Sequence, residues 1–373
     1  MSRQKQGGKP AETKDGGTLA AAHTTASGQR QTDILSAGSP GLSAWLKEHG
    51  EEPFRAGQIL RWVCQRQADS FEEMTDIKKD LRERLARDFV VPRLALLDQA
   101  ESGDGSVKYL FGLSDGQAVE AVLMAERDHY TLCVSSQVGC AMGCAFCRTG
   151  AMGLSRNLTA GEIVAQVRDA LTLAPGKMRL TNLVFMGMGE PLANYDNLVA
   201  AITLLMDADR GFAFAGRKVT VSTAGIAPNI PRLGRDTRAS LAVSLNAVDD
   251  ALRTRLMPIN ATYPIEDLLA ACNRFPLQKG RRITFEYVLL AGVNDSVTEA
   301  KKLASLLHPK RAKVNLIPYN PHDASPFSRP SERAVRDFQQ VLLDRHYTTV
   351  IRKSRGADIH AACGQLRAKA LGE

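Results

Sequence analysis

Three cysteine side chains, Cys140, Cys144 and Cys147, lie within eight residues of one another in the stretch CAMGCAFC. Thiolates this close repel one another unless a cation neutralises them, so the spacing predicts a metal or a metal–sulfur cluster. Zinc would take four ligands, usually as two separated pairs, and the nearest histidine is His129. An iron–sulfur cube held by three thiolates leaves one iron free for an external ligand, as catalysis at a cluster requires. A cluster is therefore the first expectation, and zinc is the alternative.

The rest of the chain must supply a folded framework around these thiols. Its 373 residues suffice for two or three domains, and 44% hydrophobic residues exclude a wholly disordered or fibrous protein. Seven cysteines are too few for a secreted disulfide scaffold, and no apolar run approaches the ~20 residues of a membrane span. Because no apolar leader follows the first methionine, we expect a cytoplasmic protein with reduced cysteines and no membrane partner.

The net charge of +8 is a weak indication of a polyanionic partner, because Lys and Arg that neutralise phosphates release counterions. The excess is concentrated near the C-terminus, and a solvated terminal face is the alternative reading. Between residues 348 and 369 the basic residues are Arg352, Lys353, Arg355, Arg367 and Lys369, and the one acid is Asp358.

The first 128 residues divide by composition into three parts. Residues 1–40 hold too few large apolar side chains to offset the entropy of ordering, so we expect a disordered tail. Residues 41–92 carry apolar side chains at helical spacing, which predicts a small helical module. Residues 93–128 contain short strand-like runs separated by the turn sequences SGDGS (102–106) and SDG (114–116), which indicates a short β linker region.

Residues 129–373 alternate apolar strand-like runs with amphipathic helices. The runs cover residues 131–136, 181–186, 218–223, 240–245, 283–290, 313–318 and 348–353, and the clearest helices cover 158–174, 296–308 and 331–346. About six β–α units predict a parallel sheet with right-handed crossovers. We expect an α/β fold, an incomplete (β/α)6 barrel, with a doubly wound open sheet as the alternative. In both, the chemistry lies at the carboxyl ends of the strands.

Cysteines spaced C-x3-C-x2-C after the first strand of a β/α chain resemble the radical S-adenosylmethionine (SAM) superfamily. The resemblance extends to the adenine-C2 methyltransferases of 23S rRNA and tRNA, over residues 53 to 367. The matching stretches are PFRAGQILRWV, FEEMTDIKKDLRERL, TLCVSSQVGCAMGCAFC, MGMGEPL, VTVSTAG, RLMPIN, NLIPYNP and TTVIRKSRGADIHAACGQL. The combination of CVSSQVGC with AACGQL is the most specific of these signals.

The resemblance implies a catalytic domain over residues 129–373 that holds a [4Fe-4S] cluster on Cys140, Cys144 and Cys147 and binds SAM. It implies that Cys363 in AACGQL carries a methyl group, and that Cys133 resolves the covalent RNA adduct through a transient disulfide with Cys363. Glu120 matches the family's proton acceptor. The positions that match SAM contacts are Gly189, Glu190, Ser222, Ser244, Leu245, Asn246 and Asn320.

One residue departs from the family pattern. The usual tripeptide SLH is Ser244, Leu245 and Asn246 here. If the family's contact is made by the histidine side chain, asparagine keeps only one such bond, whereas a backbone contact loses nothing.

The resemblance also implies 23S rRNA and tRNA as partners, and the helical module and the basic C-terminal segment are then the candidate RNA-binding surfaces. A flavodoxin-type electron donor and a monomer are expected by superfamily analogy. Four alternatives remain open at this point. They are the sister enzymes that methylate C8 of the same rRNA adenine, another radical enzyme such as a glycyl-radical activase, a non-catalytic zinc or iron–sulfur RNA-binding protein, and a thiol–disulfide oxidoreductase.

Overall fold

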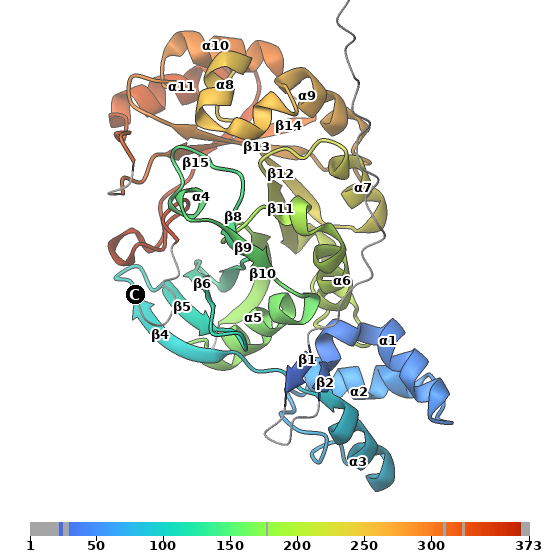
Figure 1. The fold of residues 1–373 in the computed structure, drawn as a ribbon. Coiled ribbons are helices and arrows are strands. Elements are labelled where there is room, and N and C mark those ends of the chain that lie inside the picture. The colour runs from blue at the N-terminus through green and yellow to red at the C-terminus, as the bar shows by residue number, and fades with distance from the viewer. Residues whose placement is uncertain (1–21, 25–29, 177, 309–310, 323–324, 367–373) are drawn as a thin grey trace, which may run out of the picture.

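The computed structural model describes residues 22–24, 30–176, 178–308, 311–322 and 325–366 (Figure 1). Its central feature is a ten-stranded sheet in the order β15-β14-β13-β12-β11-β10-β7-β6-β5-β4. The strands are β4 (Ala95–Glu101), β5 (Val107–Gly112), β6 (Ala118–Ala125), β7 (His129–Cys133), β10 (Arg179–Phe185), β11 (Val219–Thr223), β12 (Ser240–Ser244), β13 (Ile283–Leu289), β14 (Ala312–Pro318) and β15 (Thr348–Ile351).

From β7 to β15 all neighbouring strands are parallel, and each new strand adds beside the previous one. Six helical connections join these strands, so the predicted β–α alternation is confirmed. A doubly wound sheet would reverse its strand order at a switch point, and this sheet does not. The helices are α5 (Ala160–Leu173), α6 (Tyr195–Met206), α7 (Asn229–Asp236), α8 (Asp250–Leu256), α9 (Ile265–Arg274), α10 (Val297–Leu306) and α11 (Glu332–Asp344), with 3-10 turns η1 (Pro191–Asn194), η2 (Gly216–Lys218) and η3 (Pro258–Ala261).

The three helices that the sequence indicated most clearly begin at side-chain caps. Thr159 and Glu162 form a reciprocal capping box at the start of α5. The hydroxyls of Ser296 and Ser331 accept hydrogen bonds from backbone amides in the first turns of α10 and α11. These caps satisfy amide donors that the helices themselves cannot pair.

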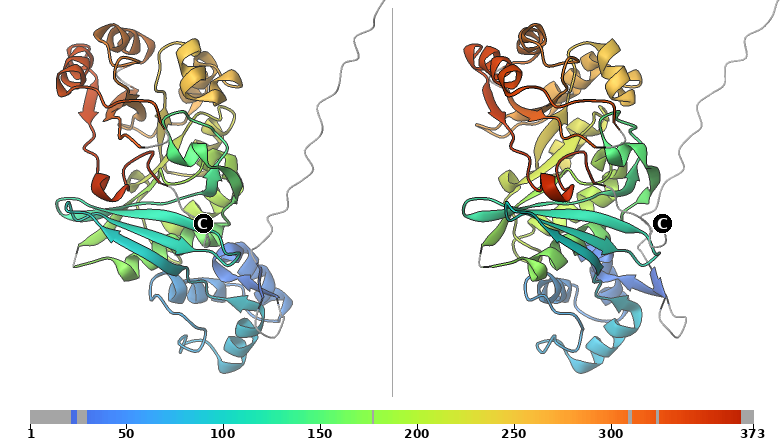
Figure 2. Two further views of the ribbon diagram at one scale, coloured as in Figure 1. Left: turned by 60° about the vertical axis from the view of Figure 1, so that its left-hand side comes forward. Right: turned by 90° about the vertical axis from the view of Figure 1, so that its left-hand side faces the viewer.

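Residues 93–128 are not a separate linker in the structure. They form β4, β5 and β6, which are antiparallel to one another and continue the main sheet beyond β7. Pairing with β7 satisfies backbone groups that an isolated hairpin would leave exposed at a sheet edge. The segment therefore forms the antiparallel end of the main sheet (Figure 2).

The N-terminal helices begin earlier than the sequence indicated. Helix α1 (Ile34–Glu48) is kinked at Gly38, and its first turn lies inside the expected tail, because Ile34 and Leu35 are buried and Asp33 caps that turn. The other elements are α2 (Arg55–Cys64), α3 (Lys79–Asp88) and a small sheet of β1 (Ala22–Thr24), β2 (Arg30–Asp33) and β3 (Phe89–Val90). Residues 1–21 and 25–29 of the predicted tail lie outside the described residues.

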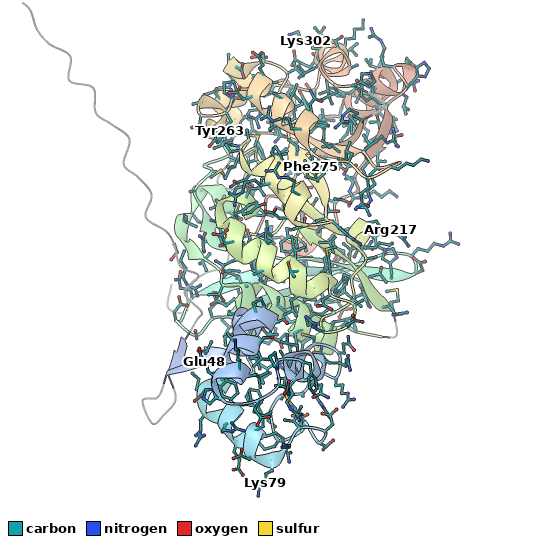
Figure 3. The ribbon with its side chains drawn as sticks, turned by 90° about the vertical axis from the view of Figure 1, so that its right-hand side faces the viewer. Glu48, Lys79, Arg217, Tyr263, Phe275 and Lys302 are labelled. Carbon is teal, nitrogen blue, oxygen red and sulfur yellow. The ribbon has the colours of Figure 1, made fainter. Side chains whose placement is uncertain are left out.

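A buried arginine on helix α5 joins this helical module to the rest of the protein. Arg168 on α5 has no exposed surface, and it donates hydrogen bonds to carbonyl oxygens of Val63, Pro92 and Ala68. Asp69 lies 2.8 Å from the same guanidinium group. Figure 3 shows the module, marked by Lys79, at the end of the molecule opposite Lys302 on α10. No helix in the described part of the chain is long and apolar enough to cross a bilayer.

Candidate active site

The three predicted cluster ligands lie on one loop that follows β7. Cys140 ends β8 (Gln137–Cys140), which pairs with β9 (Gly153–Asn157) in a two-stranded ribbon. Cys144 and Cys147 follow in the turn before α4 (Arg148–Ala151). Because the loop leaves the carboxyl end of the first parallel strand, it places the thiols over the end of the sheet where β/α proteins perform chemistry.

The surroundings of these thiols favour a bound cation. Burial raises the pKa of Cys140 to about 12, and Cys147 and Glu190 add to the rise. Burial also raises the pKa of Cys144 and of Cys147. A coordinating metal removes this obstacle by deprotonating the thiol outright. Within the described residues, no group of three His, Cys, Asp or Glu side chains is arranged to hold a single metal ion.

The cysteines share one cavity with most of the predicted SAM contacts. We name it the cluster cavity, and the predicted residues that line it are Cys140, Cys144, Cys147, Gly189, Glu190, Ser222, Ser244, Asn246, Asn320 and Cys363. The described lining of this cavity includes no lysine or arginine. Leu245 is absent from it, because its side chain is fully buried in the main hydrophobic core.

The turn after β10 brings backbone close to the cluster cavity. Gly189 has a φ of +100°, and a Cβ there would lie 2.5 Å from Cβ of Gln137, so only glycine fits. The buried carboxylate of Glu190 accepts hydrogen bonds from the Thr223 hydroxyl at 2.8 Å and from the amides of Leu192 and Ala224 at 3.0 and 2.6 Å. Burial raises the pKa of Glu190, and these hydrogen bonds oppose the rise. Glu190 thus fixes the turn against the end of β11 and keeps one of about four acceptor positions for a ligand.

Asn246 is the residue that departs from the family pattern, and its side chain has structural partners. Its φ is +59°, a left-handed conformation that asparagine tolerates better than most residues. Its Oδ1 accepts from the Val288 amide at 2.8 Å, and its Nδ2 donates to the Met257 sulfur at 3.1 Å. Both polar atoms of the side chain are hydrogen-bonded to other protein groups, so Asn246 has a structural role in the wall of the cavity.

The other polar residues at the strand ends are also tied into the sheet. Ser222 donates to the Glu286 carboxylate at 3.3 Å, and the Ser244 carbonyl accepts from Arg253 at 3.2 Å. The side-chain oxygen of Asn320 accepts from the Ser354 hydroxyl at 2.5 Å. The polar wall is therefore largely preorganised, which lowers the ordering cost of binding a cofactor.

A second cavity adjoins the first and brings together the two cysteines that lie 230 residues apart in sequence. We name it the basic cavity. Its lining includes Val122, Met124, Cys133, Arg352, Lys353, Ser354, Arg355 and Cys363. Glu286, Asn320 and Cys363 line both cavities. Cys363 therefore lies at the junction of the two spaces, and Cys133 lies only in the basic cavity.

Cys363 and Cys133 are free thiols in the structure. The side chain of Cys363 is exposed, because it lines both cavities. The protein that surrounds the cavities nevertheless displaces much of the water around the thiol. Burial raises the pKa of Cys363 to about 11, with Glu286 raising it further and Arg352 lowering it. Burial also raises the pKa of Cys133, and the nearby Cys363 adds to that rise. Cys363 is thus close enough to Cys133 to affect the ionisation of Cys133.

Glu120 lies on β6 beside the basic cavity. By strand alternation it shares a face with Val122 and Met124, which line that cavity. Its carboxylate lies 3.1 Å from the Lys108 ammonium group, and the residue is buried. Glu120 itself is not part of the lining of either cavity.

Two residues of the site, Glu286 and Arg253, were not predicted from the sequence. Glu286 lies on β13 within the apolar run ITFEYVLL, where a lone charge among buried residues was an available signal. Arg253 is fully buried, and burial lowers its pKa to about 10. It donates hydrogen bonds to the carbonyls of Ala224, Ser244 and Leu245, so it joins the ends of β11 and β12. Nothing in its local sequence distinguishes it from a surface arginine on α8.

The C-terminal segment carries Cys363 into this site from the far end of the chain. It leaves β15, makes the short turn η4 (Ala357–Ile359), and then passes beside the cysteine loop. The Arg148 amide, next to Cys147, donates to the Gly364 carbonyl at 2.8 Å. Figure 2 shows this segment lying over the antiparallel strands.

Comparison with known proteins agrees with this geometry. Residues 32–91 match the ribosomal RNA large subunit methyltransferase N-terminal domain, and residues 134–304 match the radical SAM superfamily. The chain is 54% identical over 325 residues to the dual-specificity RNA methyltransferase RlmN of Desulfosudis oleivorans, covering 87% of each chain. The corresponding protein of Anaeromyxobacter dehalogenans is 51% identical, with 90% of this chain and 92% of that protein covered.

A solved structure supports the same assignment. The crystal structure of a radical SAM methyltransferase from Sphaerobacter thermophilus matches with a TM-score of 0.84 and 46% identity, covering 90% of this chain and 99% of that one. Radical SAM proteins use a [4Fe-4S] cluster and SAM. The comparisons therefore do not favour the alternatives of a zinc-binding protein, a glycyl-radical activase or a thiol–disulfide oxidoreductase. The chain belongs to the radical SAM superfamily and, within it, to the family of dual-specificity RNA methyltransferases named RlmN.

Proposed function

We propose that this chain methylates C2 of an adenine in the peptidyl-transferase centre of 23S rRNA and of the adenine 3′ of the anticodon in tRNA, with Cys363 as the methyl carrier. The observation that carries the proposal is that Cys363 lines both cavities, whereas Cys133 lines only the basic one. A thiol at this junction can meet the cofactor on one side and an RNA base on the other.

The chemistry follows from the target atom. C2 of adenine lies between two ring nitrogens and is electron-poor, so it does not attack a sulfonium methyl group directly, whereas a carbon radical can add to it. When bound, the cluster and SAM supply a methyl group and a radical that abstracts hydrogen. Cys140, Cys144 and Cys147 would hold the cluster, and the turn at Gly189 and Glu190 would contact SAM.

The two cysteines of the basic cavity perform the covalent steps. Cys363 accepts a methyl group as its thiol proton leaves, and loss of a hydrogen atom from that methyl leaves a carbon radical that adds to C2. The ring radical gives one electron back to the flavodoxin-type redox partner and its C2 proton to Glu120, and these two losses restore the aromatic ring. Cys133 then attacks the Cys363 sulfur, and a proton is taken up by the departing methylene carbon. Methylated RNA leaves, and the Cys133–Cys363 disulfide awaits two electrons from an external reductant.

The basic cavity suits an RNA base that has been removed from its stack. Enzymes that modify a base act on unpaired loops or turn the base out into a pocket. Arg352 and Lys353 are exposed beside the cavity, where they can bind the flanking phosphates. The helical module offers a second RNA-binding surface. We further propose a monomer in the reducing cytoplasm that receives electrons from a flavodoxin-type donor.

The decisive experiment is nucleoside mass spectrometry of a 23S rRNA fragment incubated anaerobically with reconstituted enzyme, SAM and a reductant. We expect 2-methyladenosine from the wild type and none from Cys363→Ala. The appearance of 8-methyladenosine would contradict the proposed C2 position. Absence of any methylated base while SAM is cleaved would refute the proposed substrate.

A second variant tests the role of Cys133. Cys133→Ala should still form the covalent enzyme–RNA adduct but should not release it, because the resolving thiol is missing. Gel electrophoresis under denaturing, reducing conditions would show the adduct as a slower band. Cys64→Ala is a matched control, because Cys64 is a buried cysteine of α2 that lines neither cavity. Release of methylated RNA by Cys133→Ala at the wild-type rate would contradict this role.

A further inference from the structure

The turn sequence SGDGS at residues 102–106, between β4 and β5, contacts the segment that carries Cys363. The Ser102 hydroxyl donates to Oδ1 of Asp358 at 2.6 Å, and the Gly103 amide donates to Oδ2 at 3.1 Å. In return, the Gly356 amide donates to Oδ2 of Asp104 at 3.1 Å. The partners are 252 to 256 residues apart in sequence, so only the tertiary structure brings them together.

The turn is ordered by its own hydrogen bonds before it meets the C-terminal segment. The Ser106 amide donates to Oδ1 of Asp104 at 2.9 Å, and the Asp104 amide donates to the Ser102 hydroxyl oxygen at 3.3 Å. The Ser102 amide also donates to the Ser106 carbonyl at 2.8 Å. A turn that is already ordered loses little conformational entropy when it binds its partner.

Charge reinforces the same contact. Arg355 lies 3.9 Å from the Asp104 carboxylate and 3.4 Å from that of Glu126 on the loop after β6. The hydroxyl of Ser102 and the amide of Gly103 hold the pKa of Asp358 below its ordinary value. Asp358 is therefore ionised at neutral pH and is a strong hydrogen-bond acceptor.

The backbone of the C-terminal segment is shaped for this contact. Gly356 has a φ of +61°, and a Cβ there would lie 2.8 Å from Cβ of Ala361. Its carbonyl accepts the Ala361 amide at 2.8 Å, which closes a tight turn two residues before Cys363. The contact at Gly356 therefore also restrains the position of Cys363, because the chain between them forms a short hydrogen-bonded turn.

A second attachment holds the other side of Cys363. The Thr149 hydroxyl donates to the Leu366 carbonyl at 2.7 Å, beside the bond from the Arg148 amide to the Gly364 carbonyl at 2.8 Å. Both donors lie on α4, directly after Cys147. The chain is therefore held on both sides of Cys363: hydrogen bonds from α4 hold residues 364 and 366, and hydrogen bonds with the turn 102–106 hold residues 356 and 358.

We propose that the turn 102–106 is a clasp that positions Cys363 over the basic cavity for the steps on RNA. The proposal rests on the proposed function, in which Cys363 serves first the cofactor and then the base. Without the clasp, the α4 attachment still holds Cys363 near the cysteine loop, where it receives its methyl group. The thiol is then less well held toward Cys133 and the base. Asp358 is a positioning residue in this scheme, because it acts through the backbone that carries Cys363.

The test is Asp358→Ala, because this change removes the two hydrogen bonds that Asp358 accepts from Ser102 and Gly103 and leaves the internal hydrogen bonds of the turn 102–106 intact. Methylation of Cys363 is measured from the intact-protein mass, and transfer to RNA is measured in a single turnover of the premethylated, reconstituted enzyme. We expect transfer to fall on the order of 10- to 100-fold, the effect of a small misplacement of a reacting group. Methylation of Cys363, iron content and the melting temperature should remain close to those of the wild type.

Two further variants make the result specific. Asp358→Asn keeps an oxygen that can accept from Ser102 but loses the charge, so it should recover part of the transfer rate. Asp337→Ala removes an exposed acid of α11 that pairs with Arg333, and it should change neither half-reaction. In the Cys133→Ala background, Asp358→Ala should reduce the amount of covalent RNA adduct formed in a fixed time.

Two outcomes would overturn the clasp. One is wild-type transfer by Asp358→Ala, and the other is an equal loss of both half-reactions with a lowered melting temperature, which would make the contact purely stabilising. Failure of the proposed function is distinguishable from both. In that case Cys133→Ala forms no adduct even with Asp358 in place.

Discussion

The two adjoining cavities differ in charge although they share a wall. The cluster cavity is lined by four cysteines and by Glu190 and Glu286, and its described lining contains no basic side chain. Of these residues, Cys363 and Glu286 also line the basic cavity. The basic cavity is lined by Arg352, Lys353 and Arg355. A space that takes a cationic sulfonium and a metal cluster needs anionic ligands, whereas RNA phosphates need cations. The contrast fits the proposed binding of the cofactor and of RNA on opposite sides of Cys363.

The first prediction concerns a variant that should abolish cluster binding in the cluster cavity and leave the basic cavity intact. Cys144→Ala leaves two thiolates, so the chain should no longer hold its cluster, and methylation should fall below detection. Iron per chain and the visible absorbance of the reconstituted protein measure the loss. RNA binding by electrophoretic shift should stay within about twofold, because each cluster ligand lies outside the basic cavity. Retained iron with full activity would contradict the assignment of Cys144.

The second prediction removes the charge of the basic cavity while the cluster cavity stays intact. Arg352→Gln with Lys353→Gln should weaken RNA binding several-fold and reduce the slope of log K against log salt by about 0.7 for each lost phosphate contact. Arg355 is a poorer choice, because it already pairs with Asp104 and Glu126.

A matched control for this charge removal is Arg333→Gln with Arg336→Gln. Both arginines are exposed on α11 and pair with acids of the same helix. SAM cleavage without RNA should be unchanged in either double variant. An unchanged salt slope for the variant at residues 352 and 353 would exclude this segment from the RNA interface.

The third prediction concerns the shared wall and has the smallest expected effect. Burial raises the pKa of Cys363 to about 11, while the nearby Glu286 raises it further and Arg352 lowers it. Glu286→Gln removes a negative charge and should lower this pKa, whereas Arg352→Gln should raise it. Below the pKa the thiolate fraction changes tenfold per unit, so alkylation of Cys363 near pH 8 should become faster in the first variant and slower in the second. Shifts of the same sign would show that these charges do not act on Cys363.

The alkylation measurement uses protein without its cluster, in the Cys133→Ala background, with the modified cysteine identified by peptide mass spectrometry. The cluster ligands also react, so the rate is read from the peptide that contains Cys363 alone. Glu299→Gln serves as the control, since this acid lies on α10 and lines neither cavity.

Local sequence patterns predicted most of the framework but not all of it. Apolar runs and Ser or Thr caps identified strands β7 and β10 to β15 and helices α5, α10 and α11, because local periodicity and capping decide those elements. The short strands β8 and β9 around the cysteine loop were not predicted. The beginning of α1 was missed, because burial of Ile34 and Leu35 against other helices is a tertiary effect. The placement of β4–β6 was missed for a similar reason, since pairing with β7 is not encoded in their own pattern.

Some properties of this protein are set by the sequence alone. The spacing of Cys140, Cys144 and Cys147 fixes three thiols on one loop, because a chain of eight residues cannot spread them far. Other properties needed the fold. Cys363 meets Cys133, and Asp358 meets Ser102, only because the last strand returns the chain to the sheet beside residues more than 200 positions earlier. Sequence spacing limits how far apart near neighbours can lie, whereas contacts between distant residues depend on the packing of the whole sheet.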